Sequence, residues 1–113
     1  MIAFHNAPER YAAARLTQIP MIQGWNLYQG WYEKDITGFE RILDRLHAQY
    51  PDKVLIVTEY GADVDPRLHS FSPEQFDFSQ EYGLVYNRHY LEEMQKRPFI
   101  AGSSLWNLNA FYS

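Results

Sequence analysis

The sequence predicts an α/β fold in which short parallel strands alternate with helices. Three observations support this prediction. Residues 53–63 begin as a short apolar, β-branched run, which is typical of a buried strand in a parallel sheet. A one-sided amphipathic helix comes directly before this run, and a further helix and strand follow it. All three predicted strands end in polar or aromatic residues, and such residues are typical of the sheet edge that carries an active site.

The first predicted helix begins at Asn6 and continues through the alanine-rich residues 11–16. Asn6 would cap this helix, Pro8 suits an early helical position, and Glu9 stands three residues after the cap. Pro20 ends the helical segment, because proline cannot continue a helix.

The first predicted strand covers residues 20–26, which are too short and too apolar for a helix, and an aromatic-rich loop at 27–32 follows it. The second predicted helix begins at another capping box, Thr37 to Glu40. Its apolar residues recur in steps of three and four and define one buried face: Ile36, Phe39, Leu43, Leu46 and Tyr50.

The second predicted strand follows this helix and ends at Glu59. A polar connection at 61–78 comes next, and a connection above the usual length is often functional. A third helix is predicted at 79–97 and a third strand at 99–106, which completes the alternation of helices and strands.

Polar and aromatic side chains stand at the end of each predicted strand. Asn26 and Tyr28 follow the first strand, Glu59 ends the second, and Trp106 and Asn107 follow the third. The carboxyl ends of parallel strands meet at one rim, and barrel enzymes carry their active sites there. We therefore expect these residues to converge, although Glu59 alone would fit a surface glutamate that ends a strand.

The composition predicts a folded globular chain and excludes several functions. Of 113 residues, 46% are hydrophobic and 17% aromatic, and this surplus of rings suits a surface that binds sugars or a protein partner. The net charge is −4 and the basic residues are scattered, so no nucleic-acid partner is expected. No apolar run reaches the ~18 residues of a membrane span. Cysteine is absent, and neither a metal nor another cofactor is predicted.

Two further sets of residues suggest other chemistry and are set aside. Ser103 and its neighbour Ser104 lie in a predicted strand without a nucleophile elbow, so a serine hydrolase is excluded. The four histidines are not spaced as metal ligands would be. His5, His47 and His89 are interpreted as ordinary surface or helix residues, and His69 is kept as a candidate.

Three motifs, in this order, resemble the last third of the catalytic barrel of glycoside hydrolase family 2. They are Gly-Trp-Asn-Leu-Tyr-Gln-Gly-Trp-Tyr at 24–32, Thr-Glu-Tyr-Gly-Ala at 58–62, and Trp-Asn at 106–107. The tracts 67–79 and 97–103 look most like bacterial β-galactosidases of that family. The resemblance implies a partial (β/α)8 barrel, with barrel strands 6 to 8 alternating with helices. Residues 1–113 would be a C-terminal fragment of the catalytic domain.

The resemblance also implies functions for individual residues. The whole protein would cleave terminal β-galactosides by double displacement with Glu59 as the nucleophile. Tyr28 would donate a hydrogen bond that holds the Glu59 carboxylate ionised and aimed. Trp106 would form the floor beneath the sugar, with a non-proline cis peptide bond expected just there. Further contacts with the β-galactoside substrate are implied for Asn26, Trp31, His69 and Asn107.

The sequence departs from a complete enzyme of this family. A retaining glycosidase needs a second carboxyl about 5–5.5 Å from the nucleophile, and the family's acid/base Glu follows an Asn, a pair that this chain lacks. Asp63 and Asp65 lie in the polar connection and are expected to be solvated. A whole barrel takes ~250 residues. The chain is therefore expected to be truncated and inactive alone.

Three parallel strands would leave two open edges and uncovered apolar faces, which favour association. We expect self-association, or a requirement for the missing upstream part of the barrel. Two other functions stay open. One is a β-glucuronidase of the same family, whose residues for the glucuronate carboxylate would lie beyond Ser113. The other is a non-catalytic carbohydrate-binding or assembly fragment that uses the same aromatic rim.

Overall fold

A computed structural model describes residues 1–107 of the chain. The α/β fold is confirmed, and no helix among these residues is long and apolar enough to cross a membrane. A short 3-10 turn at Leu16–Gln18 joins the first helix to the second strand. The elements in chain order are β1 (Ile2–Phe4), α1 (Pro8–Ala13), β2 (Ile22–Asn26), α2 (Gly38–Gln49), β3 (Val54–Tyr60), α3 (Gln80–Gln95) and β4 (Ile100–Leu105).

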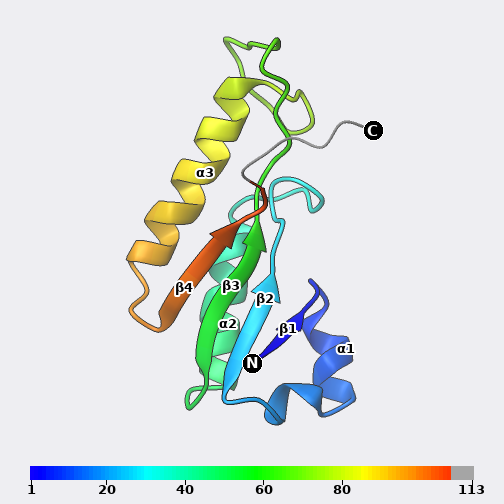
Figure 1. Ribbon diagram of the computed structural model, residues 1–113, viewed down its shortest axis with the longest axis vertical. Helices are drawn as coiled ribbons and strands as arrows, with labels where there is room; N and C mark the ends of the chain where they lie inside the picture. The colour runs from blue at the N-terminus through cyan, green and yellow to red at the C-terminus, as the bar shows by residue number, and fades with distance from the viewer. Residues whose placement is uncertain (108–113) are drawn as a thin grey trace.

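The strands form one parallel sheet in the order β1-β2-β3-β4, so all of their carboxyl ends lie at the same edge (Figure 1). The three predicted strands are present as β2, β3 and β4. The structure adds β1, which the sequence analysis did not predict. β1 has only three residues, and it forms by pairing with β2, from Ile2 opposite Gln23 to Phe4 opposite Trp25.

The predicted side-chain caps of the first two helices do not form, because other polar groups bind the capping residues. The Asn6 side chain accepts a hydrogen bond from Gln29 Nε2 at 2.9 Å, and α1 starts after Ala7 without a side-chain cap. The Thr37 hydroxyl donates to Asp35 at 2.6 Å and does not cap α2. The third helix is capped, since the Ser79 hydroxyl accepts from the Tyr82 N–H at 3.0 Å.

The core lies between the sheet and its helices. In Figure 1, α2 runs behind the sheet and α3 lies beside β4. α2 buries the predicted face of Phe39, Leu43 and Leu46. α3 buries aromatic residues at four-residue steps, and one of them, Tyr90, stacks on Phe39 with ring centroids 3.7 Å apart. This stack joins the two helices over the same face of the sheet.

The other face of the sheet has no helix of residues 1–107 over it (Figure 1). Side chains alternate along a strand, so the residues between the buried Trp25, Leu55 and Val57 point to this uncovered face. In the middle strands they include Gly24, Asn26, Ile56 and Thr58. This face leads directly to the carboxyl edge, where Tyr28, Glu59 and Trp106 lie.

Candidate active site

A β-bulge shapes the end of β3. Trp25 lies opposite Val57, but the next residue of β2, Asn26, lies opposite Glu59, so Thr58 is the extra residue on β3. Consecutive side chains on a regular strand point to opposite faces, and a bulge changes that direction. Here Thr58 and Glu59 both reach side chains of the β2 segment. The bulge therefore brings the Glu59 carboxylate into the group of polar residues at the sheet edge.

Glu59 is bound by Tyr28, as the resemblance implies. The Tyr28 hydroxyl donates a hydrogen bond to Glu59 Oε2 at 2.8 Å, and the Leu27 N–H donates to the Glu59 carbonyl at 2.9 Å. Burial raises the pKa of Tyr28 well above its ordinary value, and the bond to Glu59 raises it further. The phenol therefore stays protonated and remains a donor at physiological pH. Within residues 1–107, Glu59 Oε1 has no hydrogen-bond partner.

Trp106 lies beside the end of β3. Its backbone N–H donates to the Tyr60 carbonyl at 2.8 Å, and the residue is 52% exposed. The peptide bond from Trp106 to Asn107 is cis, at the position that the resemblance implies. Gly61 lets the backbone at Trp106 pack closely against the end of β3. The φ of Gly61 is +153°, and a Cβ added to it would lie 2.2 Å from the Trp106 carbonyl oxygen.

Tyr32 is an aromatic residue of this edge that the sequence analysis did not single out. Its ring centroid lies 5.0 Å from that of Tyr28, and its side chain is 66% exposed. The Tyr28 carbonyl accepts from the Trp31 N–H at 2.9 Å and from the Glu33 N–H at 3.3 Å, so the loop folds back on itself in a tight turn. The aromatic enrichment of the loop at 27–32 is the sequence signal that could have identified Tyr32.

Trp31 is not part of the open edge. Its side chain is only 2% exposed, and its ring contacts Phe76, Phe78 and Tyr82 with centroids 5.0, 5.2 and 6.2 Å away. This burial gives no support to the expected contact with a sugar. Trp31 instead anchors the long connection between β3 and α3 to the aromatic loop.

His69 also lies apart from the cluster. Its Nδ1 is 2.9 Å from Glu81 Oε1 in the first turn of α3, and no contact of residues 1–107 joins His69 to Glu59 or Tyr28. The structure thus places Asn26, Tyr28, Glu59 and Trp106 at the carboxyl edge of the sheet and leaves Trp31 and His69 outside this group. Asn107, the other predicted site residue, follows Trp106 through the cis peptide bond.

The two aspartates of the long connection differ in their surroundings. Asp65 accepts hydrogen bonds from Arg67 Nε at 2.9 Å and Nη2 at 2.6 Å, and this pairing lowers the pKa of Asp65 to about 2. Its carboxylate therefore stays ionised at neutral pH. Asp63 is exposed to solvent, as expected from its polar surroundings.

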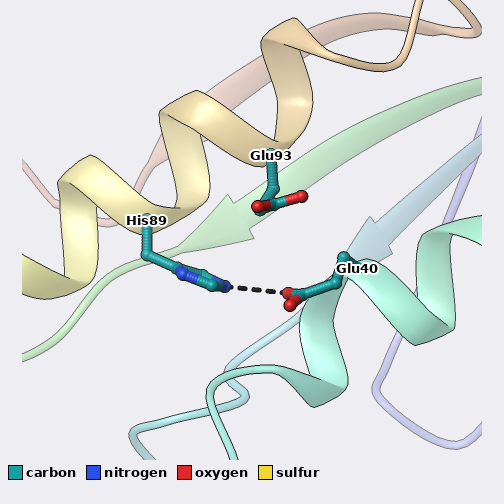
Figure 2. Close-up of side chains that lie close together, drawn as sticks. All are labelled: Glu40, His89 and Glu93. Atoms are coloured by element: carbon teal, nitrogen blue, oxygen red, sulfur yellow. Dashed lines mark hydrogen bonds and ion pairs between the residues drawn. The ribbon is translucent and has the colours of Figure 1, made fainter.

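A His-Glu-Glu group between α2 and α3 is the set of residues most similar to a metal site within 1–107 (Figure 2). The ligand atoms of Glu40, His89 and Glu93 lie within 4.8 Å of one another. However, His89 Nε2 pairs with Glu40 Oε2 at 2.8 Å. Glu93 is held by Lys96 at 2.8 Å and Arg97 at 2.7 Å, which lower the pKa of its carboxyl. A hydrogen bond between α2 and α3 and two ion pairs at the end of α3 account for this group.

Comparisons with known proteins identify similar solved structures and curated sequences. No protein-family model matches the chain. A solved structure of a calcium-binding mutant of Bacteroides uniformis β-glucuronidase 2 is 48% identical, with a TM-score of 0.92 over 98% of this chain and 13% of that protein. In another structure, with a TM-score of 0.88 over 93% of this chain and 12% of that protein, the same enzyme is covalently bound to cyclophellitol-6-carboxylate aziridine.

Two further relatives differ in the enzyme activity that their names give. The β-glucuronidase of Streptococcus agalactiae is 32% identical over 92 residues, which are 76% of this chain and 15% of the relative. A Bacteroides fragilis protein assigned as a β-galactosidase is 29% identical, with a TM-score of 0.70 over 76% of this chain and 14% of its own.

The chain thus spans between 12% and 15% of the length of these relatives. The expectation that β-galactosidases are the most similar proteins is not confirmed. By sequence and by structure, the chain resembles a segment of a glycoside hydrolase, and its match to β-glucuronidases is more specific than its match to a β-galactosidase.

Proposed function

We propose that this chain is part of a retaining glycoside hydrolase that cleaves β-glucuronides, with Glu59 as its nucleophile. The observation that carries the proposal is the 2.8 Å hydrogen bond from Tyr28 to Glu59, at the carboxyl ends of adjacent parallel strands. A nucleophilic carboxylate must be ionised and aimed, and a phenol donor on one oxygen serves both needs. The similarity to β-glucuronidase structures gives this pair its chemical context.

In this mechanism, the free oxygen of Glu59 attacks the anomeric carbon while the bond to the leaving oxygen breaks. A second carboxylic acid, about 5–5.5 Å away, protonates the leaving oxygen. Water then attacks the glycosyl ester, the second carboxylate takes the water's proton, and Glu59 is released as a carboxylate. Tyr28 holds Oε2 throughout, and the half-exposed indole of Trp106 offers an apolar face to the C–H face of the sugar.

The second carboxyl is proposed to come from the rest of an eight-stranded barrel, in which this chain forms a C-terminal segment of the catalytic domain. Several features support this arrangement. All four strands are parallel, helices cover only one face, and β1 and β4 are edge strands within residues 1–107. Further strands would pair with these edges and enclose the uncovered face. We call this chain, together with the polypeptide that supplies the other strands, the assembled barrel.

A β-glucuronide is the favoured substrate because the 48% identical Bacteroides uniformis enzyme reacts covalently with a carboxylate-bearing cyclophellitol aziridine. A β-galactoside is the second candidate, and the similarity to the Bacteroides fragilis protein favours it. The residues that distinguish the two sugars are proposed to lie in other parts of the assembled barrel. This chain would supply the nucleophile and the floor of the sugar site in either case.

The proposal is tested by release of nitrophenol from 4-nitrophenyl β-D-glucuronide and the matching β-D-galactoside by the assembled barrel. Faster hydrolysis of the glucuronide is expected. Glu59→Gln should remove the activity, because an amide is not a competent nucleophile. The control is Glu92→Gln on the exposed side of α3. Hydrolysis that survives Glu59→Gln would refute the role of Glu59. Sugar binding without any turnover in the unaltered protein would favour the non-catalytic fragment.

A further inference from the structure

A second hydrogen-bonded pair joins the same two strands next to Glu59. The Thr58 hydroxyl donates to Asn26 Oδ1 at 2.6 Å. Asn26 lies opposite Glu59 in the strand register, so its amide is carried by the backbone position nearest to the nucleophile on β2. Thr58 has no part in the mechanism described above.

The orientation of Thr58 is fixed by Gly24. A Cβ placed on Gly24 would lie only 2.5 Å from Thr58 Cγ2, so the threonine methyl group fills the space that a larger residue would occupy. A β-branched side chain sets its methyl and hydroxyl together through one torsion angle. With the methyl group over Gly24, the hydroxyl points to Asn26, two residues further along β2.

This bond determines which groups Asn26 can offer to a ligand. An asparagine amide has one acceptor oxygen and an NH2 group with two donors. Its oxygen is bound to Thr58, and no hydrogen bond links its Nδ2 to another of residues 1–107. A partly buried donor at the rim of a site requires an acceptor, and a sugar hydroxyl oxygen is a suitable one. If the amide were rotated by half a turn, its oxygen would face the sugar in place of the two donors.

We propose that Thr58 is a positioning residue that acts through Asn26, and that it turns the Asn26 NH2 group toward a hydroxyl of the sugar bound at Glu59. This inference rests on the proposed glycoside hydrolase function. It gives a role to Thr58, which belongs to the motif at 58–62 but to which the resemblance assigned no function. The bulge in β3 makes this possible, because it lets Thr58 and Glu59 act on the same edge.

The test compares Thr58→Val with Thr58→Ser in the assembled barrel, using the aryl glycoside that the unaltered protein cleaves. Valine keeps the branched shape but loses the donor, and kcat/KM is expected to fall roughly 10-fold. Serine keeps the donor and should recover most of this loss. A Thr58→Val protein with unchanged kcat/KM would overturn the inference.

Repeating Thr58→Val in an Asn26→Ala background shows whether Thr58 positions Asn26 or only supports the fold, with kcat/KM as the measured quantity. If Thr58 acts through the amide, the second substitution should change kcat/KM by less than roughly twofold, because the group it orients is gone. A full additional loss in that background would overturn the inference. Failure of the proposed function would look different, since the unaltered protein would then hydrolyse neither glycoside.

A spectroscopic readout gives a second test on the chain itself. The 15N-labelled side-chain amide of Asn26 should change its resonance positions in Thr58→Val and keep them in Thr58→Ser. The amide of Asn87 on α3 serves as the internal reference. An Asn26 amide signal that is the same in all three proteins would contradict the proposed contact.

Discussion

Tyr28 and Glu59 are 31 positions apart in the chain, yet the phenol of one donates a 2.8 Å hydrogen bond to the carboxylate of the other. Two features of the fold create this contact. Parallel pairing of β2 with β3 places both residues at the same edge, and the bulge at Thr58 turns Glu59 toward Tyr28. The contact therefore depends on strand register as well as on the residues themselves.

Removing this hydrogen bond should slow the reaction without preventing folding. For Tyr28→Phe in the assembled barrel, we expect kcat to fall roughly 10- to 100-fold, since a hydrogen bond to a charged group is worth about 1.5–3 kcal/mol. The control is Tyr32→Phe, because the Tyr32 ring contacts Tyr28 but its hydroxyl does not bind Glu59. Equal effects of the two substitutions on kcat would count against a specific role for the bond.

Gly61 should be required for the stability of the site. In Gly61→Ala, the new methyl group would lie 2.2 Å from the Trp106 carbonyl oxygen at a φ of +153°. We expect the free energy of unfolding in urea to fall by about 2 kcal/mol or more. Gly102→Ala is a matched control, because nothing lies within 4 Å of its added Cβ. If both variants unfold at the same urea concentration, the short distance between Gly61 and the Trp106 carbonyl does not determine the stability.

Trp31 should contribute to stability and not to sugar binding. Its indole is 2% exposed within an aromatic cluster, so Trp31→Ala is expected to cost about 3–5 kcal/mol in the free energy of unfolding. Trp106→Ala should cost much less, because that side chain is half exposed. Urea denaturation measures both. A stable Trp31→Ala protein with weakened sugar affinity would restore the role first expected for Trp31.

The Arg97 bridge between the helices should make stability depend on pH. Arg97 binds Asp44 through Nε at 2.7 Å and through Nη2 at 3.0 Å, and this pairing lowers the pKa of Asp44. A carboxyl whose pKa is lower in the folded state stabilises the protein above its ordinary pKa. That contribution is lost as the pH falls through the lowered value.

For Asp44→Asn, we therefore expect a loss of about 0.5–1 kcal/mol in unfolding free energy at pH 7, in keeping with a partly exposed ion pair. The difference should shrink as the pH falls below the ordinary pKa of aspartate. Urea unfolding at several pH values measures it, with the exposed Asp52→Asn as the control. A loss that stays constant down to strongly acidic pH would show that the ion pair is not its cause.

Sequence patterns predicted the parts of this fold that depend on local periodicity. The buried face of α2 and the end of β3, which lies at Tyr60 next to the predicted Glu59, are visible in the order of apolar residues alone. The bulge at Thr58 was not predictable, because it depends on how β3 pairs with β2. β1 is too short to show a pattern of its own.

The burial of Trp31 and the absence of two predicted helix caps have a common physical cause. Trp31 is covered by Phe76 and Phe78, which lie more than forty residues later in the chain. Asn6 and Thr37 have suitable side chains for capping, but Gln29 and Asp35 compete for them in the folded structure. Local sequence shows what a residue can do, and tertiary contacts decide which of its possible partners it binds.

The most direct test of the central claim is covalent labelling of the assembled barrel with cyclophellitol-6-carboxylate aziridine, followed by mass spectrometry of its peptides. The nucleophile should open the aziridine ring, forming an ester while the ring nitrogen takes a proton. We expect the added mass on the peptide that contains Glu59, and none in Glu59→Gln. An adduct on another carboxylate, or labelling that persists in Glu59→Gln, would contradict the assignment of Glu59 as the nucleophile.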